Sequence, residues 1–349
     1  MSNLLRVKTV AYKGSKRKLI SQIAALAEEI SAKSVFDGFS GTGIVSANLR
    51  HLGLKVCAND LNISSYLYGK VFLEGYNRET VDHHLRQMNN LSPVGGWVTK
   101  NYAGTTVRKV RGFEDTQERP LGLLHKNASM VDAARDYVEE LNHITQEDKN
   151  ALIFSVILGC DSVFNNSNDQ KSSLKEWSSK SKKDVVFCAP TLVEGAPGIQ
   201  HKGDVFSLKG IDVDMIYFDP PYTGGVLYKS CYHLNDSLTF WDKPALDYSY
   251  AIPRPARACF KGKKPSPFYS KKTISDDFHL LLETHRAPRV VLSYSDAPRN
   301  IISIEELVKV GKNYGNVTVK NKEHKICTQP KTQEKRSTKL KEYFIIIDN

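Results

Sequence analysis

The amino-terminal part of the chain shows helical and extended hydrophobic patterns in turn. Residues 18–30 carry apolar side chains at three- and four-residue intervals, which predicts an amphipathic helix. The short apolar runs 34–36 and 54–58 predict strands, and residues 44–52 between them predict a second helix. This order of strand, helix and strand predicts a βαβ unit with parallel strands.

The middle of the chain has a different pattern. Residues 83–113 contain no acidic residue, and their prolines and glycines interrupt any long period, so we expect loops and short elements there. Helical periodicity returns in residues 129–164, where 148–163 predict a buried helix. Residues 165–183 are rich in Asn, Ser and Lys and predict a surface loop.

Strand patterns return in the last third of the chain. A second α/β half begins near Gly203, and the apolar runs 215–218 and 289–294 predict strands. A helix over 304–310 and two closing strands, the last ending with 343–347, complete the pattern. The fold class is therefore expected to be α/β, with an insertion in the middle.

Composition narrows the class of protein. With 49 Lys and Arg residues against 38 Asp and Glu residues, the 349-residue chain has a formal net charge of +11. This charge favours a polyanionic partner, nucleic acid ahead of an anionic membrane, although a basic surface can also serve solubility alone. The six cysteines form no Cys-x-x-Cys pair or zinc spacing, so we expect reduced thiols and no metal site.

No segment at the amino terminus has the apolar core of a secretory signal, and no window approaches the roughly 18 apolar residues of a membrane span. We therefore expect a cytoplasmic protein with no membrane partner, associated with the nucleoid if its partner is DNA.

A glycine-containing turn follows the first predicted strand. Asp37 opens the turn, and its glycines, which permit close backbone approach, are Gly38, Gly41 and Gly43. Asp60 ends the next strand about 20 residues later, where an acid can bind the hydroxyls of a ribose. A dinucleotide fingerprint would have Gly in place of Ser46, and Asp37 would repel a pyrophosphate. S-adenosylmethionine, with its cationic amine, therefore fits this turn better than NAD.

The tetrapeptide 219–222, Asp-Pro-Pro-Tyr, directly follows the apolar run 215–218. The Asp219 carboxylate and the Pro220 carbonyl can each accept a hydrogen bond from an exocyclic amine. The prolines offer no N–H and hold the backbone extended, and Tyr222 can stack on a ring. The tetrapeptide predicts a site for the amine of a nucleobase; a plain strand followed by a turn is the alternative.

A basic turn, residues 12–16, precedes the first helix. It is either a solvated turn or a lid on the cofactor, in which Lys16 meets a carboxylate and Tyr12 packs on the ligand.

The order of these motifs resembles the DNA adenine methylase (Dam-like) family of N6-adenine-specific DNA methyltransferases. The motifs are Tyr-x-Gly-x-Lys, Asp-Gly-Phe-Ser-Gly-Thr-Gly, Asn-Asp, Gly-Asp-Val and Asp-Pro-Pro-Tyr, and the tracts 165–177 and 228–234 are also similar. The similarity covers residues 9–347. It implies a Rossmann-like S-adenosylmethionine-dependent methyltransferase sheet from residues 1–76 and 200–349, with an inserted, mainly helical DNA-recognition region in 77–199.

The resemblance also implies roles for individual residues. The cofactor would be bound by Tyr12, Lys16, Asp37, Gly38, Phe39, Gly41, Gly43, Asp60, Asp204 and Val205. The target adenine would be held by the catalytic residues Asp219, Pro220, Pro221 and Tyr222. The family usually has Trp at the position of Tyr12 and often Phe at the position of Val205. Two basic clusters are candidates for DNA contacts, namely Arg108, Lys109 and Arg111, and Arg254, Lys261, Lys263 and Lys264.

The implied function is site-specific transfer of a methyl group from S-adenosylmethionine to the N6 amine of an adenine flipped out of double-stranded DNA. A restriction-modification or phage context is expected, with a cognate restriction endonuclease as a candidate partner. Methylation of an RNA or protein amine, a non-catalytic DNA-binding protein with a decayed fold, and a nicotinamide oxidoreductase are the alternatives.

Overall fold

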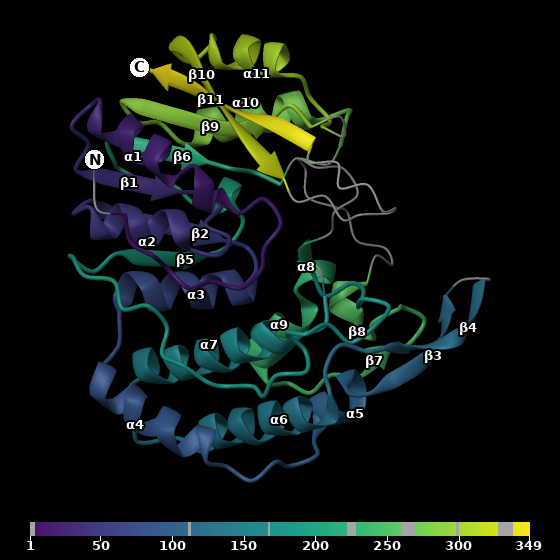
Figure 1. The fold of residues 1–349 in the computed structure, drawn as a ribbon. Helices are drawn as coiled ribbons and strands as arrows, with labels where there is room; N and C mark the ends of the chain where they lie inside the picture. The colour runs from purple at the N-terminus through teal and green to yellow at the C-terminus, as the bar shows by residue number, and fades with distance from the viewer. Residues whose placement is uncertain are drawn as a thin grey trace.

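A seven-stranded sheet forms the centre of the part of the molecule that contains both termini (Figure 1). The computed structural model describes residues 4–110, 113–166, 168–221, 228–259, 268, 270–297, 300–326 and 338–349. In sheet order the strands are β10 (Asn316–Ile326), β11 (Thr338–Asp348), β9 (Arg289–Ser295), β6 (Met215–Phe218), β1 (Ser34–Asp37), β2 (Lys55–Asp60) and β5 (Ile199–Lys202). Strand β11 runs antiparallel to both of its neighbours, whereas β9, β6, β1, β2 and β5 are parallel.

The strand order reverses between β1 and β6. From β1 the chain extends the sheet through β2 to β5, and from β6 it extends the sheet in the other direction to β9. In open α/β sheets, ligands bind at such a reversal, outside the carboxyl ends of the strands. The predicted βαβ unit and the Rossmann-like α/β sheet are both confirmed.

Helices cover both faces of the sheet. Alternate residues of β6 belong to two separate apolar clusters, Met215 and Tyr217 to one and Ile216 and Phe218 to the other. The first cluster includes residues of α1 (Ile20–Glu28), α2 (Ile44–His51) and α3 (Ile63–Glu74), and the second includes residues of α10 (Ile274–Thr284) and α11 (Ile304–Gly311). A strand covered on both faces must be apolar throughout, which explains why β6 is an uninterrupted apolar run.

A mainly helical part lies beside α3, along the lower side of Figure 1. It contains α4 (Arg78–Asn89), α5 (Trp97–Tyr102), α6 (His125–Glu140) and α7 (Gln146–Val163). The predicted buried helix over 148–163 is confirmed: α7 packs against α3, α4 and α6, and the Thr145 side chain caps its first turn by accepting a hydrogen bond from the Asp148 N–H. None of the helices in the described ranges is long and apolar enough to span a membrane.

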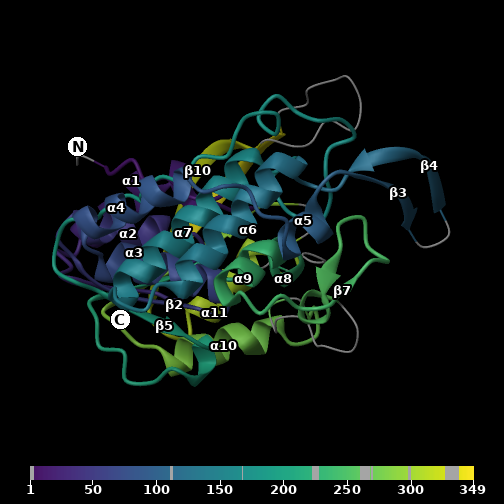
Figure 2. The same ribbon diagram turned by 90° about the horizontal axis from the view of Figure 1, so that it is seen from below.

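The structure differs from expectation in three places. Residues 83–89 are the end of α4, and β3 (Thr105–Val110) pairs with β4 (Phe113–Pro120) in an antiparallel hairpin, which extends away from the helices (Figure 2). Strand β5 was not predicted. The described residues of the segment 165–183 are irregular, as predicted. The prediction of a surface loop is wrong, because several polar side chains of this segment are buried, namely Asn165, Asn166, Gln170 and Ser181.

A second stretch of chain joins the helical part. It contains α8 (Tyr228–Cys231), α9 (His233–Phe240), β7 (Leu246–Asp247) and β8 (Arg254–Pro255). Arg135 in α6 donates from Nε to the Leu238 carbonyl at 2.7 Å, and Trp97 donates from Nε1 to the Pro244 carbonyl at 2.9 Å. A segment that the sequence assigns to the catalytic domain therefore packs against the inserted helices.

Candidate active site

Three carboxylates lie at the carboxyl edge of neighbouring strands. Asp37 is the last residue of β1, Asp60 is the last residue of β2, and Asp219 directly follows β6. Because β6, β1 and β2 are adjacent and parallel, the strand order brings these three acids together at the point where the sheet order reverses.

Asp37 has an unused hydrogen-bond acceptor in the interior. Asp37 is 1% exposed; its Oδ2 accepts a hydrogen bond from Ser46 Oγ at 2.6 Å, and its Oδ1 has no partner among the described residues. Burial raises the pKa of Asp37 to about 7, and the nearby Asp219 and Asp60 carboxylates add to the rise. A buried acceptor of this kind suits a cationic N–H donor of a ligand. Ser46, which breaks the dinucleotide fingerprint, thus orients Asp37.

The glycine turn holds the second carboxylate. Gly41 and Gly43 have φ values of +52° and +72°, in the left-handed region that favours glycine. The Gly41 N–H donates to Asp60 Oδ2 at 2.8 Å, and the Asn62 N–H donates to Asp60 Oδ1 at 2.8 Å. These two bonds fix the plane of the carboxylate, while burial raises the pKa of Asp60 to about 6.

Tyr12 covers this turn. A Cβ built at Gly41 would lie 3.4 Å from Tyr12 Cε1, and the Tyr12 ring stacks on Tyr232 with centroids 4.4 Å apart and planes 10° apart. The Tyr232 hydroxyl in turn accepts a hydrogen bond from the Lys13 N–H at 2.7 Å. Tyr232 is a site residue that the sequence prediction missed, although it lies in the similar tract 228–234.

Lys16 and Asp219 form an ion pair. The Lys16 Nζ lies 2.6 Å from Asp219 Oδ2 and 3.5 Å from Glu342 Oε1, and both Lys16 and Glu342 are buried. Burial raises the pKa of Asp219 to about 6, against the opposing effect of the Lys16 ammonium. Glu342 was not predicted, because an acid that follows two lysines, Lys339 and Lys341, has the pattern of a solvent-facing residue.

The residues after β5 divide between surface and core. Asp204 is exposed and accepts a hydrogen bond from the Phe206 N–H at 3.2 Å. Val205 is 4% exposed and belongs to the apolar core. The neighbouring Phe206 is half-buried and stacks on Phe268, whose ring also meets Phe39 edge-on. The aromatic surface expected at Val205 is therefore offered by the next residue, which the sequence prediction did not name.

The structure describes only some of the remaining predicted residues. Pro220 and Pro221 follow Asp219 at the sheet edge, and Tyr222 lies outside the described residues. Arg108 and Lys109 lie on β3 of the hairpin. Arg254 is 6% exposed, and its guanidinium lies 4.0 Å from the centroid of the Tyr250 ring, so it presents little charge to a partner here. Outside the described ranges are Arg111, Lys261, Lys263 and Lys264.

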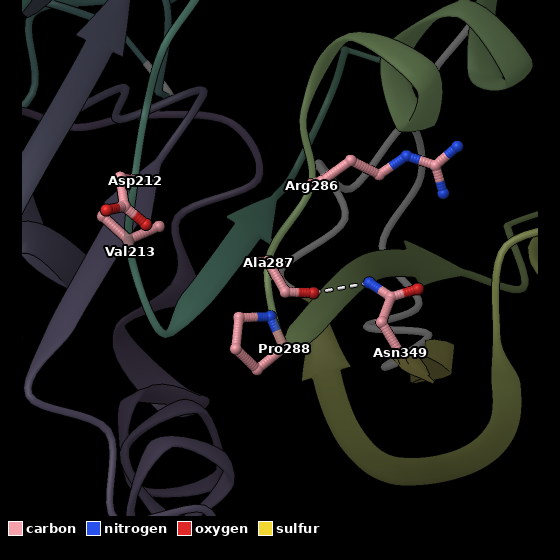
Figure 3. Close-up of a pocket in the computed structure, with 6 residues that line it drawn as sticks. All are labelled: Asp212, Val213, Arg286, Ala287, Pro288 and Asn349. Atoms are coloured by element: carbon pink, nitrogen blue, oxygen red, sulfur yellow. Dashed lines mark hydrogen bonds between the residues drawn. The ribbon is translucent and has the colours of Figure 1, made fainter.

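An open cavity of about 550 Å³ lies at the opposite edge of the sheet. Its lining residues, shown in Figure 3, are Asp212, Val213, Arg286, Ala287, Pro288 and Asn349. Residues 212–213 precede β6 and residues 286–288 precede β9, so this cavity is separate from the three carboxylates.

Comparison with known proteins agrees with this geometry. The family model of the D12 class N6 adenine-specific DNA methyltransferases matches residues 12–252. The chain is 24% identical over 355 residues to the type II methyltransferase M.NlaIII of Neisseria lactamica, covering 97% of this chain and 98% of that protein. It is 25% identical over 327 residues to the type II methyltransferase M.CviAII of Paramecium bursaria Chlorella virus 1, covering 90% and 92%.

A crystal structure of a Pyrococcus horikoshii protein, proposed to be an RNA methyltransferase, covers 95% of this chain and 82% of that chain at 11% identity. Its TM-score of 0.34 is too low to bear on the fold.

Proposed function

Because the chain belongs to the D12 class N6 adenine-specific DNA methyltransferase family, we propose that its candidate active site binds S-adenosylmethionine and holds an adenine rotated out of the DNA duplex. The activity predicted from the sequence, methylation of the adenine N6 amine in DNA, is confirmed by the family match. The observation that carries the assignment to this site is the meeting of Asp37, Asp60 and Asp219 at the reversal of the sheet.

The described residues fit S-adenosylmethionine. The unpartnered Oδ1 of Asp37 is a buried acceptor for the α-amine of the methionine moiety, and Asp60 is fixed by two backbone N–H groups where a ribose would lie. Lys16 supplies a cation for the cofactor carboxylate, and Tyr12 closes the site above Gly41. When bound, the cofactor supplies an activated methyl group on a sulfonium centre.

The protein's part in the reaction is to position the adenine amine. Asp219 and the Pro220 carbonyl would each accept a hydrogen bond from one N–H of the amine, which directs the nitrogen lone pair toward the methyl donor. Positive charge then develops on that nitrogen and would be stabilised by the Asp219 carboxylate, and loss of one N6 proton to solvent would leave the neutral methylated amine. Tyr222 would stack on the extruded base and offset part of the lost stacking, worth about 1–3 kcal/mol per base in single-strand binding.

The hairpin and the lysines of the second basic cluster would contact the DNA. Arg108 and Lys109 lie on β3, and Arg111 follows it in the sequence; Lys261, Lys263 and Lys264 belong to the sequence stretch 254–272, which has no acid. Contacts of this kind act mainly on phosphates, so the affinity for DNA should fall steeply with salt. An affinity that does not change between 50 and 200 mM salt (about the range over which such contacts act) would contradict both clusters.

The two relatives are type II methyltransferases. On this basis we infer that the chain protects DNA against a cognate restriction endonuclease. Sequencing the DNA of a host that expresses the chain would identify the methylated adenine and its sequence context. A nuclease encoded beside the chain should then fail to cut that context once it is methylated. Unimpeded cleavage of methylated DNA would contradict the pairing.

Asp219→Ala tests the catalytic assignment. Asp219→Asn is the matched variant, which keeps the shape of the side chain and removes its charge. Transfer of labelled methyl to duplex DNA should be lost in Asp219→Ala and reduced at least about 100-fold in Asp219→Asn, while DNA binding is retained. RNA and protein are offered in parallel assays. Wild-type turnover in Asp219→Ala would overturn the role of Asp219, and failure of the wild-type protein to bind S-adenosylmethionine in calorimetry would overturn the cofactor assignment.

A further inference from the structure

Glu342 is a buried carboxylate that reaches the active site from the antiparallel strand β11. It is 2% exposed, and its Oε1 accepts a hydrogen bond from Ser293 Oγ at 2.6 Å and lies 3.5 Å from Lys16 Nζ. None of the motifs that define the cofactor and adenine sites contains Glu342 or Ser293. Both residues are therefore available for a role that the motifs do not describe.

The register of the sheet explains how Glu342 reaches Lys16. Strand β9 lies between β11 and β6, and Ser293 of β9 pairs with Phe344 of β11. Glu342 is two residues from Phe344, so its side chain lies on the same face of the sheet as Ser293. Phe218 pairs with Leu292, which places Asp219 at the end of the row that contains Ser293. A small residue on the intervening strand leaves room for Glu342 to approach the Lys16–Asp219 pair.

The three charges are unbalanced. One ammonium, Lys16, serves two carboxylates, Asp219 and Glu342, and it also donates to the Gly14 carbonyl at 3.3 Å. Of the two acids, Glu342 is the more deeply buried, with 3% of its side chain exposed against 18% for Asp219. A buried carboxylate is tolerated when it is paired and hydrogen-bonded, and Ser293 and Lys16 meet both needs for Glu342.

We propose that Glu342 is a positioning residue for methyl transfer: with Ser293, it holds the Lys16 ammonium in the active site when the Asp219 carboxylate turns to the adenine amine. In the structure Asp219 Oδ2 is occupied by Lys16. Adenine binding requires that carboxylate to accept an N–H, so Lys16 must keep its place through its other anions: the cofactor carboxylate, when bound, and Glu342, which the protein itself supplies. Glu342 Oε1 lies 3.5 Å from Lys16 Nζ, within 1 Å of the 2.6 Å that separates Lys16 Nζ from Asp219 Oδ2. This inference rests on the proposed function of Asp219.

The charged and titratable groups around Asp219 come from four elements. They are Lys16 before α1, Asp37 of β1, Tyr217 of β6 and Glu342 of β11. Lys322 of β10 lies directly opposite Glu342 in the strand register and is exposed. Among these groups, Lys16 lowers the pKa of Asp219 and Glu342 raises it. Removal of the Glu342 charge should therefore lower the pKa of Asp219, whereas Ser293→Ala, which keeps that charge, should leave it in place.

The test compares Glu342→Gln with Glu305→Gln, which removes an acid from the exposed side of α11. We expect Glu342→Gln to lower kcat by about 10- to 100-fold, the range for a misplaced catalytic group, while the acidic limb of kcat/KM, which Asp37 sets at about pH 7, stays in place. Glu305→Gln should behave as wild type. The Asp219 carboxyl ¹³C resonance can be identified by its loss in Asp219→Asn. In Glu342→Gln this resonance should titrate at lower pH than in the wild type, and the measurement does not depend on catalytic activity.

A wild-type kcat in Glu342→Gln, or an Asp219 titration at the wild-type pH, would overturn the inference. If that variant does not fold, Ser293→Ala replaces it: the Glu342 charge is kept, so the Asp219 titration should stay in place while kcat falls at least about threefold, and an unchanged kcat would overturn the inference. Failure of the proposed function has a different signature, because the wild-type protein would then be inactive or Asp219→Ala would be fully active.

Discussion

The Lys16 ammonium and the Asp219 carboxylate form an ion pair with a 2.6 Å separation in the interior of the protein. The two residues come from the basic turn before α1 and from the end of β6, so the pair joins the motif predicted to cover the cofactor to the motif predicted to hold the adenine. Removal of one member of a buried pair leaves the other uncompensated, which makes Lys16 a sensitive position.

Lys16→Met should therefore impair both activity and stability. Lys16 lowers the pKa of Asp219, so its loss should raise that pKa above about 6 and move the acidic limb of kcat/KM to higher pH. Loss of the pair should destabilise the fold by about 3 kcal/mol. Urea unfolding at pH 8 and a pH–rate profile measure the two effects. Lys16→Arg keeps the charge and should retain most of the stability; a fully stable Lys16→Met would contradict the importance of the pair.

When the pH is lowered, the wild-type enzyme should begin to lose activity at a higher pH than an enzyme whose essential carboxylates are exposed. Burial raises the pKa of Asp219 and Asp60 to about 6 and that of Asp37 to about 7. The proposed mechanism needs all three ionised, so kcat/KM should decline as the pH falls from about 7 to 6. Because kcat/KM reports the free enzyme, the measurement is its pH profile on duplex DNA at constant ionic strength. Undiminished kcat/KM at pH 5 would contradict the roles of these acids.

Asp37→Asn should stabilise the protein at alkaline pH while it abolishes cofactor binding. A folded-state pKa above the unfolded value means that Asp37 favours folding at low pH, and that this contribution is lost as the pH rises through about 7. At pH 8 the variant avoids a buried charge, so it should gain between about 1 and 4 kcal/mol, the upper figure corresponding to the full pKa difference.

Urea unfolding at pH 8 and at pH 5 measures the effect, and the advantage of Asp37→Asn should shrink at the lower pH. Ser46→Ala is the companion variant: it removes the hydrogen bond that lowers the pKa of Asp37 and keeps the charge, so it should destabilise at pH 8. A variant Asp37→Asn that is less stable than wild type at pH 8 would contradict the pKa assignment.

The sequence predicted the parts of the fold that local patterns determine. Buried parallel strands are apolar throughout, and the turn after β1 needs glycine at the positive φ of Gly41 and Gly43. Both features can be recognised without the rest of the chain. The hairpin β3–β4 was missed because its strands carry charged residues in succession and lack an alternating pattern.

Contacts between distant segments account for the rest. Gln170 is buried because its side-chain oxygen accepts a hydrogen bond from the Leu234 N–H at 2.9 Å, a partner in another segment of the chain. Glu342 is buried for the same kind of reason, since Lys16 and Ser293 lie far away in sequence. A polar residue that depends on a distant partner looks like a surface residue in the sequence, which is why the loop 165–183 and Glu342 were interpreted incorrectly or missed.

Gly38→Ala should destabilise the fold from within the active site. A Cβ at position 38 would lie 2.4 Å from Phe218 Cε1, and the Phe218 ring is already in contact with Phe36, Phe39 and His285. Because these rings cannot all move aside, we expect a loss of about 1–3 kcal/mol, typical of overpacking. Gly95→Ala is the matched control, since a Cβ there meets no atom within 4 Å and Gly95 is not among the glycines with positive φ. Urea unfolding of both variants decides the point: equal stability would show that the Phe218 ring can yield.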